Sequence, residues 1–441
     1  MAGYSDLAVR DGARPFITDE HRTYTYGEVA AMVRERATRL AVSKDAVMAV
    51  APDNTIESLV SCLAVWEAGG VLQLINSRLT PSEVAPQLAR TGAALTGHNR
   101  LSGLATPPAS LPDAHRGEER ALIVATSGTG GRARLVELTW ANLLASAEAS
   151  RQHLRHLPED RWLAVLPLFH VGGFSIVVRS LLVGGEVVLR RSFDPSLTAE
   201  DLHGVTLASL VGAMLPRILA ADPGPYGGLR AVLVGGGPTA QTVLDDAVVA
   251  GIPVLSTYGM TETASQIATA PLGDGARRRT LAVPGAEIRV DSSGEIEVRG
   301  PMVSRRYVGE PLRGADEWFR TGDLGTIDAD GYLRVTGRRD NLIISGGENI
   351  LPSEVEAAFE RVEGVHAVAV FGVPHPDWGQ QVAAAVVADM PLSLIEAAVR
   401  GHLADYKLPK RWLEVGELPR DELGKVDRYA LKLMLEDANG G

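Results

Sequence analysis

Short apolar runs alternate with amphipathic stretches from residue 26 to about residue 261. The apolar runs have the length and β-branched content of buried strands, and the amphipathic stretches repeat at helical spacing. Such alternation predicts βαβ units, in which helices cover a mostly parallel sheet. Ligands of these sheets bind beyond the carboxyl ends of the strands. We expect strands at residues 47–50, 71–75, 121–125, 162–166, 187–189, 206–210, 230–234 and 253–257.

The pattern changes after residue 284. Two alternating runs, 287–290 and 295–299, are joined by Asp291-Ser292-Ser293-Gly294, which is a hairpin signal. We therefore expect a small antiparallel or β-barrel-like subdomain before residue 339. The remaining residues repeat a β-α-β scheme, which is typical of a separate small domain. The prediction is an α/β fold with a large N-terminal domain, residues 1–339, and a small α+β C-terminal domain, residues 340–441.

Length and charge support more than one domain and exclude some functions. At 441 residues the chain exceeds the size at which a single core usually stops growing. A formal net charge of −11, with no basic stripe, argues against a nucleic-acid partner. The N-terminus lacks a signal-peptide pattern and no apolar run approaches bilayer length, so we expect a cytoplasmic protein without membrane insertion. The single cysteine, Cys62, excludes a disulfide framework within the chain.

A glycine-rich segment follows the expected strand 121–125 and precedes a helix that begins near Thr139. Its backbone N–H groups and hydroxyls can surround an anion, and the guanidinium of Arg134 can balance the charge. The segment lacks the GxxxxGK[ST] pattern of a Walker A loop. It predicts a polyphosphate cradle, with a flexible surface turn as the alternative. The cradle residues are Thr126, Ser127, Gly128, Thr129, Gly130 and Gly131.

Two further segments follow expected strands in the same way. Gly235, Gly236 and Gly237 either let a flat ligand approach the backbone or form a tight strand-to-helix turn. The segment after strand 253–257 combines an aromatic ring, a glycine, a hydroxyl and a carboxylate. Its chemistry suits base stacking, close approach, a phosphate contact and Mg²⁺ binding, respectively. These residues are Tyr258, Gly259, Thr261 and Glu262, with Met260 between them.

Asp323 lies in the sequence Thr321-Gly322-Asp323. A carboxylate after a glycine turn suits a ribose diol, and turn capping is the alternative. Arg338 could add a second contact to ribose or phosphate.

These motifs together resemble those of the acyl-adenylate-forming superfamily, in its acyl-CoA ligase branch. They occur in one fixed order across nearly the whole chain: TSGTGGRARLV, PLFHVGG, GGGPTA, TYGMTETASQ, TGD, GRRDNLIISGGENILPSEVE and LPRDELGKVDR. The resemblance implies ATP, Mg²⁺ and coenzyme A as cofactors and a small carboxylic acid as substrate. It assigns the nucleotide to residues 126–131, Arg134, Gly235, Gly236, Gly237, Tyr258, Gly259, Met260, Asp323 and Arg338, and the metal to Glu262.

The resemblance also implies how the reaction proceeds. Lys425 would reach the substrate carboxylate and the α-phosphate during adenylation, with Thr261 on the α-phosphate. The C-terminal domain would then rotate about a hinge near Asp340 and present Gly347 and Trp378 to the pantetheine arm of coenzyme A. One departure is that Arg134 stands where the family usually has lysine, beside changes at Gly130, Ala133 and Leu135. Arginine keeps the charge without the compact ammonium, which bears on rate and ATP affinity.

The acid pocket is expected near His170 and Arg179. His170 either caps a helix or gates the thiol entrance. Arg179 interrupts an apolar helix, so it either reaches solvent or meets an anion in the pocket, such as the second carboxylate of a diacid. Ser265 and Gln266 would be polar partners there.

Within the superfamily, the motifs are most similar to those of the o-succinylbenzoate–CoA ligases of menaquinone biosynthesis, whose substrate is an aromatic diacid. The alternatives are another aryl- or fatty-acyl-CoA ligase, a carrier-protein-loading adenylation enzyme, and a nucleotide sensor without catalysis. The oligomeric state, a homodimer included, stays open.

Overall fold

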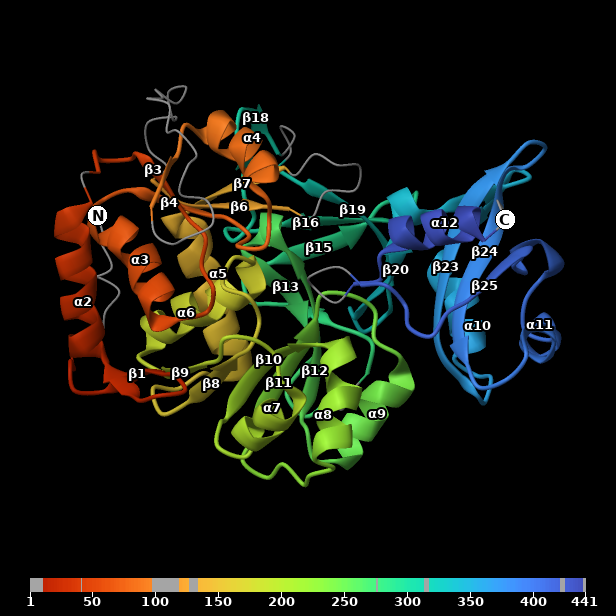
Figure 1. The fold of residues 1–441 in the computed structure, drawn as a ribbon, viewed down its shortest axis with the longest axis horizontal. Coiled ribbons are helices and arrows are strands. Elements are labelled where there is room, and N and C mark those ends of the chain that lie inside the picture. Colours follow the sequence, from red (N-terminus) through yellow and green to blue (C-terminus); the bar gives the residue numbers. More distant parts are fainter. Residues whose placement is uncertain are drawn as a thin grey trace. The chain divides into compact units, whose positions relative to one another are not determined.

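The computed structural model describes residues 11–40, 42–96, 119–126, 134–274, 277–312, 317–420 and 425–438 (Figure 1). Its mixed α/β architecture confirms the predicted fold class. The chain divides into two compact units. Unit 1 comprises Met1–Gly235, Gln241–Ile288 and Val298–Phe319, and unit 2 comprises Gly236–Ala240, Arg289–Glu297 and Arg320–Gly441. Among the described helices, none has the length and apolarity that a bilayer span requires.

Unit 1 contains two sheets. The larger has the order β14-β13-β12-β11-β10-β8-β9-β1-β2, and its central strands β12, β11, β10, β8 and β9 are parallel, as the alternating pattern predicts. Its strands are β14 (Leu281–Ala282), β13 (Ser265–Thr269), β12 (Val254–Met260), β11 (Ala231–Gly235), β10 (Leu207–Val211), β8 (Arg161–Ala164), β9 (Glu186–Leu189), β1 (Pro15–Thr18) and β2 (Thr23–Thr25).

The second sheet of unit 1 has the order β18-β17-β7-β6-β4-β3-β5. Strands β4, β3 and β5 are parallel to one another and to β6, whereas β7 returns antiparallel to β6. The strands are β18 (Glu310–Pro311), β17 (Arg306–Tyr307), β7 (Leu135–Thr139), β6 (Arg120–Ala125), β4 (Val71–Leu74), β3 (Val47–Val50) and β5 (Ala94–Leu95).

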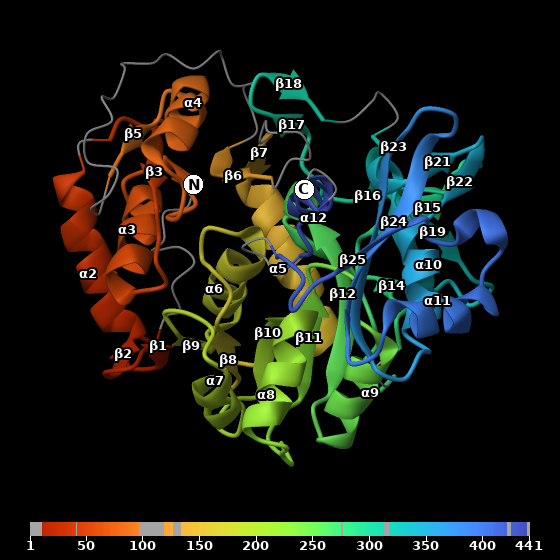
Figure 2. The same ribbon diagram turned by 45° about the vertical axis from the view of Figure 1, so that its right-hand side comes forward.

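Helices lie between the two sheets and on their outer faces (Figures 1 and 2). The central layer is α3 (Ile56–Glu67), α5 (Trp140–Leu154) and α6 (Val171–Val183), with α2 (Tyr26–Arg39) packed against α3. The outer helices are α4 (Pro81–Thr91), α7 (Pro195–Leu202), α8 (Leu215–Ala221) and α9 (Gln241–Val249), with the 3-10 turns η1 (Gly212–Met214) and η2 (Thr261–Thr263) between elements.

Alternating side chains on the strands explain this layering. Along β11, Ala231 and Leu233 join the core between the sheets, whereas Val232 and Val234 join the outer core with α7, α8 and α9. A strand whose two faces are both apolar is stable only when both faces are covered. Helix α5 begins at its predicted cap, since the Thr139 side chain accepts from the Asn142 N–H.

Unit 2 contains most of a four-stranded sheet and all of a five-stranded sheet. The first has the order β15-β16-β19-β20 and the second β22-β21-β24-β23, with β25 beside β24. The strands are β15 (Glu287–Val290), β16 (Glu295–Arg299), β19 (Phe319–Ile327), β20 (Leu333–Arg338), β21 (Ile343–Ser345), β22 (Glu348–Ile350), β23 (Val365–His375), β24 (Gly379–Ala388) and β25 (Arg411–Glu414).

The helices of unit 2 cover both faces of its five-stranded sheet. Along β24, Val382, Ala384 and Val386 face α10 and α11, whereas Ala383 and Ala385 face α12. This is the period-two alternation of a strand that is buried on both sides. The helices are α10 (Pro352–Phe359), α11 (Leu392–Arg400) and α12 (Arg428–Asp437), with the 3-10 turns η3 (Arg339–Asn341) and η4 (Asp405–Lys407).

Several strand boundaries differ from the predicted ones, and two of these differences affect candidate residues. Strand β12 continues to Met260 instead of ending at residue 257, because β13 returns beside it and completes its hydrogen bonds. Asp323 was expected after a turn, but it lies inside β19. There it is the register partner of Arg338 on β20. Hairpin pairing extends both strands through residues whose composition is typical of loops.

Candidate active site

The turn between β12 and β13 shapes one wall of the candidate site. The Thr263 hydroxyl donates to the Ser265 carbonyl at 2.6 Å, and the Met260 N–H donates to the same hydroxyl at 3.1 Å. Ala264 has φ 52° and Ser265 has φ 113°, which are left-handed values that side chains other than glycine rarely adopt. Strained backbone of this kind is held in place by its surroundings and is common at functional sites.

Gly259 is fixed by packing within this hairpin. A Cβ at position 259 would lie 2.0 Å from the Ser265 carbonyl oxygen and 2.6 Å from the Gln266 Cα. The close approach of the backbones therefore accounts for glycine here, whether or not a nucleotide also lies beside it.

We expect Gly259→Ala to destabilise the protein by about 1–3 kcal/mol or more, because backbone atoms of two strands must separate. Denaturant unfolding measures the change. Gly227→Ala is the matched control, since a Cβ at position 227 meets nothing within 4 Å. Equal stability of the two variants would contradict this reading of the hairpin.

Arg179 extends from α6 toward the same turn. The residue is 2% exposed, its Nη2 donates to the Ser265 hydroxyl at 3.0 Å, and its guanidinium lies 5.3 Å from the centre of the Trp162 ring. Its Nε has no hydrogen-bond partner, and no described carboxylate forms an ion pair with it. Burial lowers the pKa of Arg179 to about 9. Arg179 was expected either to reach solvent or to point into the pocket. In the structure its guanidinium points inward and does not reach solvent.

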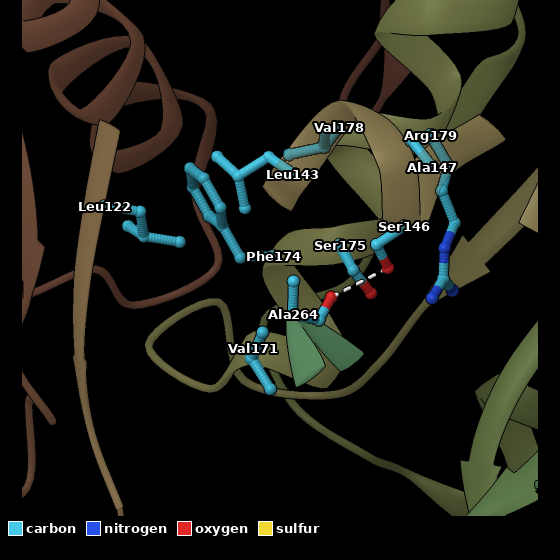
Figure 3. A pocket seen from close by; sticks show the side chains of 10 residues that line it. All are labelled: Leu122, Leu143, Ser146, Ala147, Val171, Phe174, Ser175, Val178, Arg179 and Ala264. Atoms are coloured by element: carbon cyan, nitrogen blue, oxygen red, sulfur yellow. Dashed lines mark hydrogen bonds between the residues drawn. The ribbon is translucent and has the colours of Figure 1, made fainter. Parts of the chain in front are cut away.

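Arg179 lines a small pocket in unit 1 (Figure 3). One wall is apolar and the other is polar, with Ser146 donating to the Ala264 carbonyl at 3.0 Å and Ser175 lying 3.3 Å from the Ser265 hydroxyl. The lining therefore combines an apolar wall with hydroxyl groups and one guanidinium. The lining residues are Leu122 from β6, Leu143, Ser146 and Ala147 from α5, Val171, Phe174, Ser175, Val178 and Arg179 from α6, and Ala264.

The other predicted acid-pocket residues have different surroundings. Gln266 is buried, accepts from the Ser150 hydroxyl at 3.3 Å and donates to the Thr269 hydroxyl at 2.9 Å, so its amide is engaged beside the pocket lining. His170 is the N-cap residue of α6 by position, but its side chain makes no capping hydrogen bond. Its ring lies 4.5 Å from that of Phe169.

The candidate phosphate segment falls largely outside the described residues, because 127–133 are not among them. Its two ends are held together, since the Thr126 N–H donates to the Arg134 carbonyl at 2.8 Å. The segment therefore begins and ends at the end of the β6–β7 hairpin.

Arg134, Glu262 and Tyr307 come together beside this hairpin end. The Tyr307 hydroxyl donates to Glu262 Oε1 at 2.9 Å, and the Arg134 guanidinium lies 5.3 Å from the centre of the Tyr307 ring. Thr261 precedes Glu262 in the same 3-10 turn. Glu262 and Thr261 are both partly exposed, so a ligand can reach them from solvent.

The donor set fits a magnesium ion that is bound mainly through phosphates. The described residues contain no group of three or more carboxylate, histidine and cysteine side chains that could hold a metal by themselves. Mg²⁺ is usually held by one or two carboxylates together with substrate phosphates and water. A single partly exposed carboxylate, Glu262, meets that requirement.

Gly235 ends β11 next to β12. A Cβ at position 235 would lie 2.8 Å from Thr257 Cγ2, so close strand packing requires glycine there. Gly236 has φ 85° and, like Gly237, is exposed. Tyr258 is partly exposed on β12 and has Ala268 of β13 as its register partner.

Unit 2 places its own candidate residues in two groups. Arg338 Nη1 lies 3.4 Å from Asp323 Oδ1, so the two ribose candidates are already neighbours. Trp378 stacks on His375, with ring centres 4.3 Å apart, and its carbonyl accepts from the Gly346 N–H next to Gly347. Lys425 is exposed.

Sequence reasoning missed three residues of these clusters: Trp162, Ser175 and Tyr307. Trp162 was expected only as part of a buried strand, and Ser175 only as part of an apolar helix. Tyr307 is 45 residues from Glu262, in a stretch without clear periodicity. The sequence did contain one signal for Trp162, namely the arginine at position 179 within an apolar helix. A guanidinium in such a place favours an aromatic neighbour.

Known proteins resemble this chain over nearly its whole length. A family model described as AMP-binding enzyme matches residues 6–109 and 97–308, and one described as AMP-binding enzyme C-terminal domain matches residues 354–425. The chain is 37% identical to a 2-succinylbenzoate–CoA ligase of Geobacillus kaustophilus, covering 95% of this chain and 94% of the other. It is 34% identical to one of Listeria monocytogenes, covering 94% and 95%.

Solved structures agree. The o-succinylbenzoate CoA synthetase from Bacillus subtilis, in complex with the acyl-adenylate intermediate, is 30% identical and superposes with a TM-score of 0.85, covering 97% of each chain. ATP-bound MatB from Rhodopseudomonas palustris is 27% identical, with a TM-score of 0.89 and 99% of each chain covered. The chain belongs to the AMP-binding enzyme family, the acyl-adenylate-forming superfamily that its motifs predict.

Proposed function

We infer that the protein is an AMP-forming acid–CoA ligase that converts o-succinylbenzoate to its coenzyme A thioester through an acyl-adenylate, in the cytoplasm. The observation that best supports this substrate is the surroundings of Arg179. Its guanidinium is buried in an otherwise mostly apolar pocket, and no described carboxylate pairs with it. The ligases similar to this chain act on this acid.

The charge balance of the pocket favours a diacid. A buried cation without a counter-ion is costly, and a substrate carboxylate next to Arg179 would supply the missing charge. The Ser265 hydroxyl, already bonded to Arg179, can donate to the same carboxylate. The apolar wall with Leu122, Leu143 and Phe174 would hold the aromatic ring.

The reaction then has two steps. The substrate carboxylate that is not held by Arg179 attacks the α-phosphorus of ATP and pyrophosphate leaves, which forms the mixed anhydride. The thiol of coenzyme A next attacks the acyl carbon, and AMP leaves. Lys425 would stabilise the negative charge of the first step, Thr261 would contact the α-phosphate, and Asp323 with Arg338 would hold the ribose. Mg²⁺, held by Glu262, would neutralise phosphate charge.

An apolar pocket wall also suits a monocarboxylic aromatic or fatty acid, which is the second candidate substrate class. Pyrophosphate release measured with o-succinylbenzoate, benzoate and octanoate distinguishes them. We expect the diacid to give the highest kcat/KM. If benzoate or octanoate is turned over faster, the substrate is instead a monocarboxylic aromatic or fatty acid. Transfer of the acyl group to free coenzyme A separates both from a carrier-protein-loading enzyme.

We further propose that residues 340–441 rotate about Asp340 between the two steps. Asp340 lies within the 3-10 turn η3, and its Oδ2 is 3.8 Å from Nη2 of Arg338, the residue directly before that turn. Backbone rotation at one residue suffices for a hinge, and proline restricts such rotation at φ.

Asp340→Pro is therefore expected to slow thioester formation from preformed acyl-adenylate at least about tenfold, while adenylation continues, because only one domain orientation remains accessible. Single-turnover measurements of each half-reaction report the two rates separately. Asp340→Ala, which keeps φ unrestricted, is the control. Equal rates of both steps in the proline variant would rule out a hinge at this residue.

A further inference from the structure

Tyr307 contacts a candidate metal-binding side chain and a candidate phosphate-binding side chain at once. It lies in β17, and the residue is 5% exposed. Its hydroxyl donates to Glu262 Oε1 at 2.9 Å, and the Arg134 guanidinium lies 5.3 Å from the centre of its ring. These three residues come from segments that are far apart in the sequence.

The backbone around Tyr307 fixes this arrangement. Tyr307 is the register partner of Val136 on β7, and the Val308 N–H donates to the Leu135 carbonyl at 2.8 Å, directly after Arg134. The Ser304 N–H donates to the Glu262 carbonyl at 2.7 Å. One short segment therefore holds both the main chain and the side chain of Glu262.

The Tyr307 hydroxyl is suited to hold a carboxylate in one orientation. A phenol hydroxyl has a single proton to donate, and in Tyr307 it is directed at Glu262 Oε1 at 2.9 Å. The guanidinium of Arg134 is a cation next to this ring, 5.3 Å from its centre. Only Oε1 of Glu262 accepts a bond from the described residues, and Oε2 is left for another partner.

We propose that Tyr307 is a positioning residue for the metal: it holds Glu262 Oε1 so that Oε2 points toward a magnesium ion on the ATP phosphates. This rests on the proposed function in that Glu262 is taken as the metal ligand. Outer hydrogen bonds of this kind orient a ligand and restrict its rotation. Loss of the hydroxyl should leave Glu262 free to rotate, without removing the ligand itself.

The test measures nucleotide binding without turnover. Calorimetry gives the Kd of ATP in EDTA and of Mg-ATP for the full chain and for Tyr307→Phe. The variant should bind Mg-ATP about 10- to 100-fold more weakly, the usual effect of losing such an outer partner, with ATP in EDTA bound as before. Unchanged binding in EDTA also shows that the variant is folded. Tyr226→Phe is the control, because it removes another buried hydroxyl, one that donates to the Asp222 carbonyl.

Glu262→Gln and the double variant complete the cycle. If Tyr307 acts through Glu262, the double variant binds Mg-ATP no more weakly than Glu262→Gln alone. The proposal is overturned if Tyr307→Phe binds Mg-ATP like the wild type, or if its effect adds in full to that of Glu262→Gln. Normal Mg-ATP binding by Glu262→Gln would overturn it as well, by removing the metal role of Glu262. The proposed substrate fails by a different result, when Mg-ATP binds normally and o-succinylbenzoate is not activated.

Discussion

Arg179→Met is expected to lower kcat/KM for o-succinylbenzoate by about 10²- to 10³-fold. The variant leaves the substrate carboxylate without its partner in a buried pocket, and breaking a buried ion pair in this way costs about 3–5 kcal/mol. Methionine keeps the apolar stem and the helix, so the loss reflects charge more than volume. The wild-type guanidinium has only Ser265 as a hydrogen-bond partner in the described structure and should gain the substrate carboxylate. Steady-state pyrophosphate release measures the effect.

The matched controls separate charge recognition from damage to the fold. The first control is a monocarboxylic analogue of the substrate, in which hydrogen replaces the carboxyl group that would contact Arg179. Arg179→Met should turn this analogue over at least as well as the wild type does. Arg217→Met should behave as the wild type, because Arg217 is an exposed arginine whose guanidinium lies 5.0 Å from the centre of the Phe193 ring. Equal loss for the diacid and the analogue would contradict the role of Arg179.

Lys425→Ala is expected to slow acyl-adenylate formation by about 10²- to 10³-fold, the size found when one preorganised electrostatic contact to a transition state is removed. Two anions, the acid and the α-phosphate, must approach each other in this step, and an ammonium between them lowers the repulsion. Thioester formation from preformed acyl-adenylate should continue near its normal rate, since it no longer brings two anions together.

Single-turnover formation of the acyl-adenylate measures this effect directly. Lys432→Ala on α12 is the control, since it removes another lysine of the same part of the chain. If Lys425→Ala forms the acyl-adenylate at the wild-type rate, this lysine has no part in the step. If both half-reactions slow equally, its role is general binding and not stabilisation of the first transition state.

Much of the fold could be predicted from the spacing of apolar residues. Strand β3 begins and ends at the expected residues, and α5 begins after its predicted cap, Thr139. These features depend on neighbours in the sequence, which a local pattern records. Arg179 could be singled out for the same reason, because one guanidinium within an apolar helix is a local anomaly.

Contacts between distant segments could not be predicted in this way. Gly259 was expected to make room for a ligand, and only the path of Ser265 shows that the backbones themselves need the space. The strand through Met260 depends on its pairing with β13. The bond between Tyr307 and Glu262 joins two segments with no shared pattern. Such features follow from how the strands pair.

The central claim is that the chain activates o-succinylbenzoate as an acyl-adenylate and passes the acyl group to coenzyme A. Mass spectrometry of a reaction with ATP, Mg²⁺ and o-succinylbenzoate, with and without coenzyme A, tests it most directly. Without coenzyme A we predict the mixed anhydride with AMP, together with pyrophosphate. With coenzyme A we predict the o-succinylbenzoyl thioester and free AMP. Unchanged acid in both reactions, or ADP in place of AMP, would contradict the account.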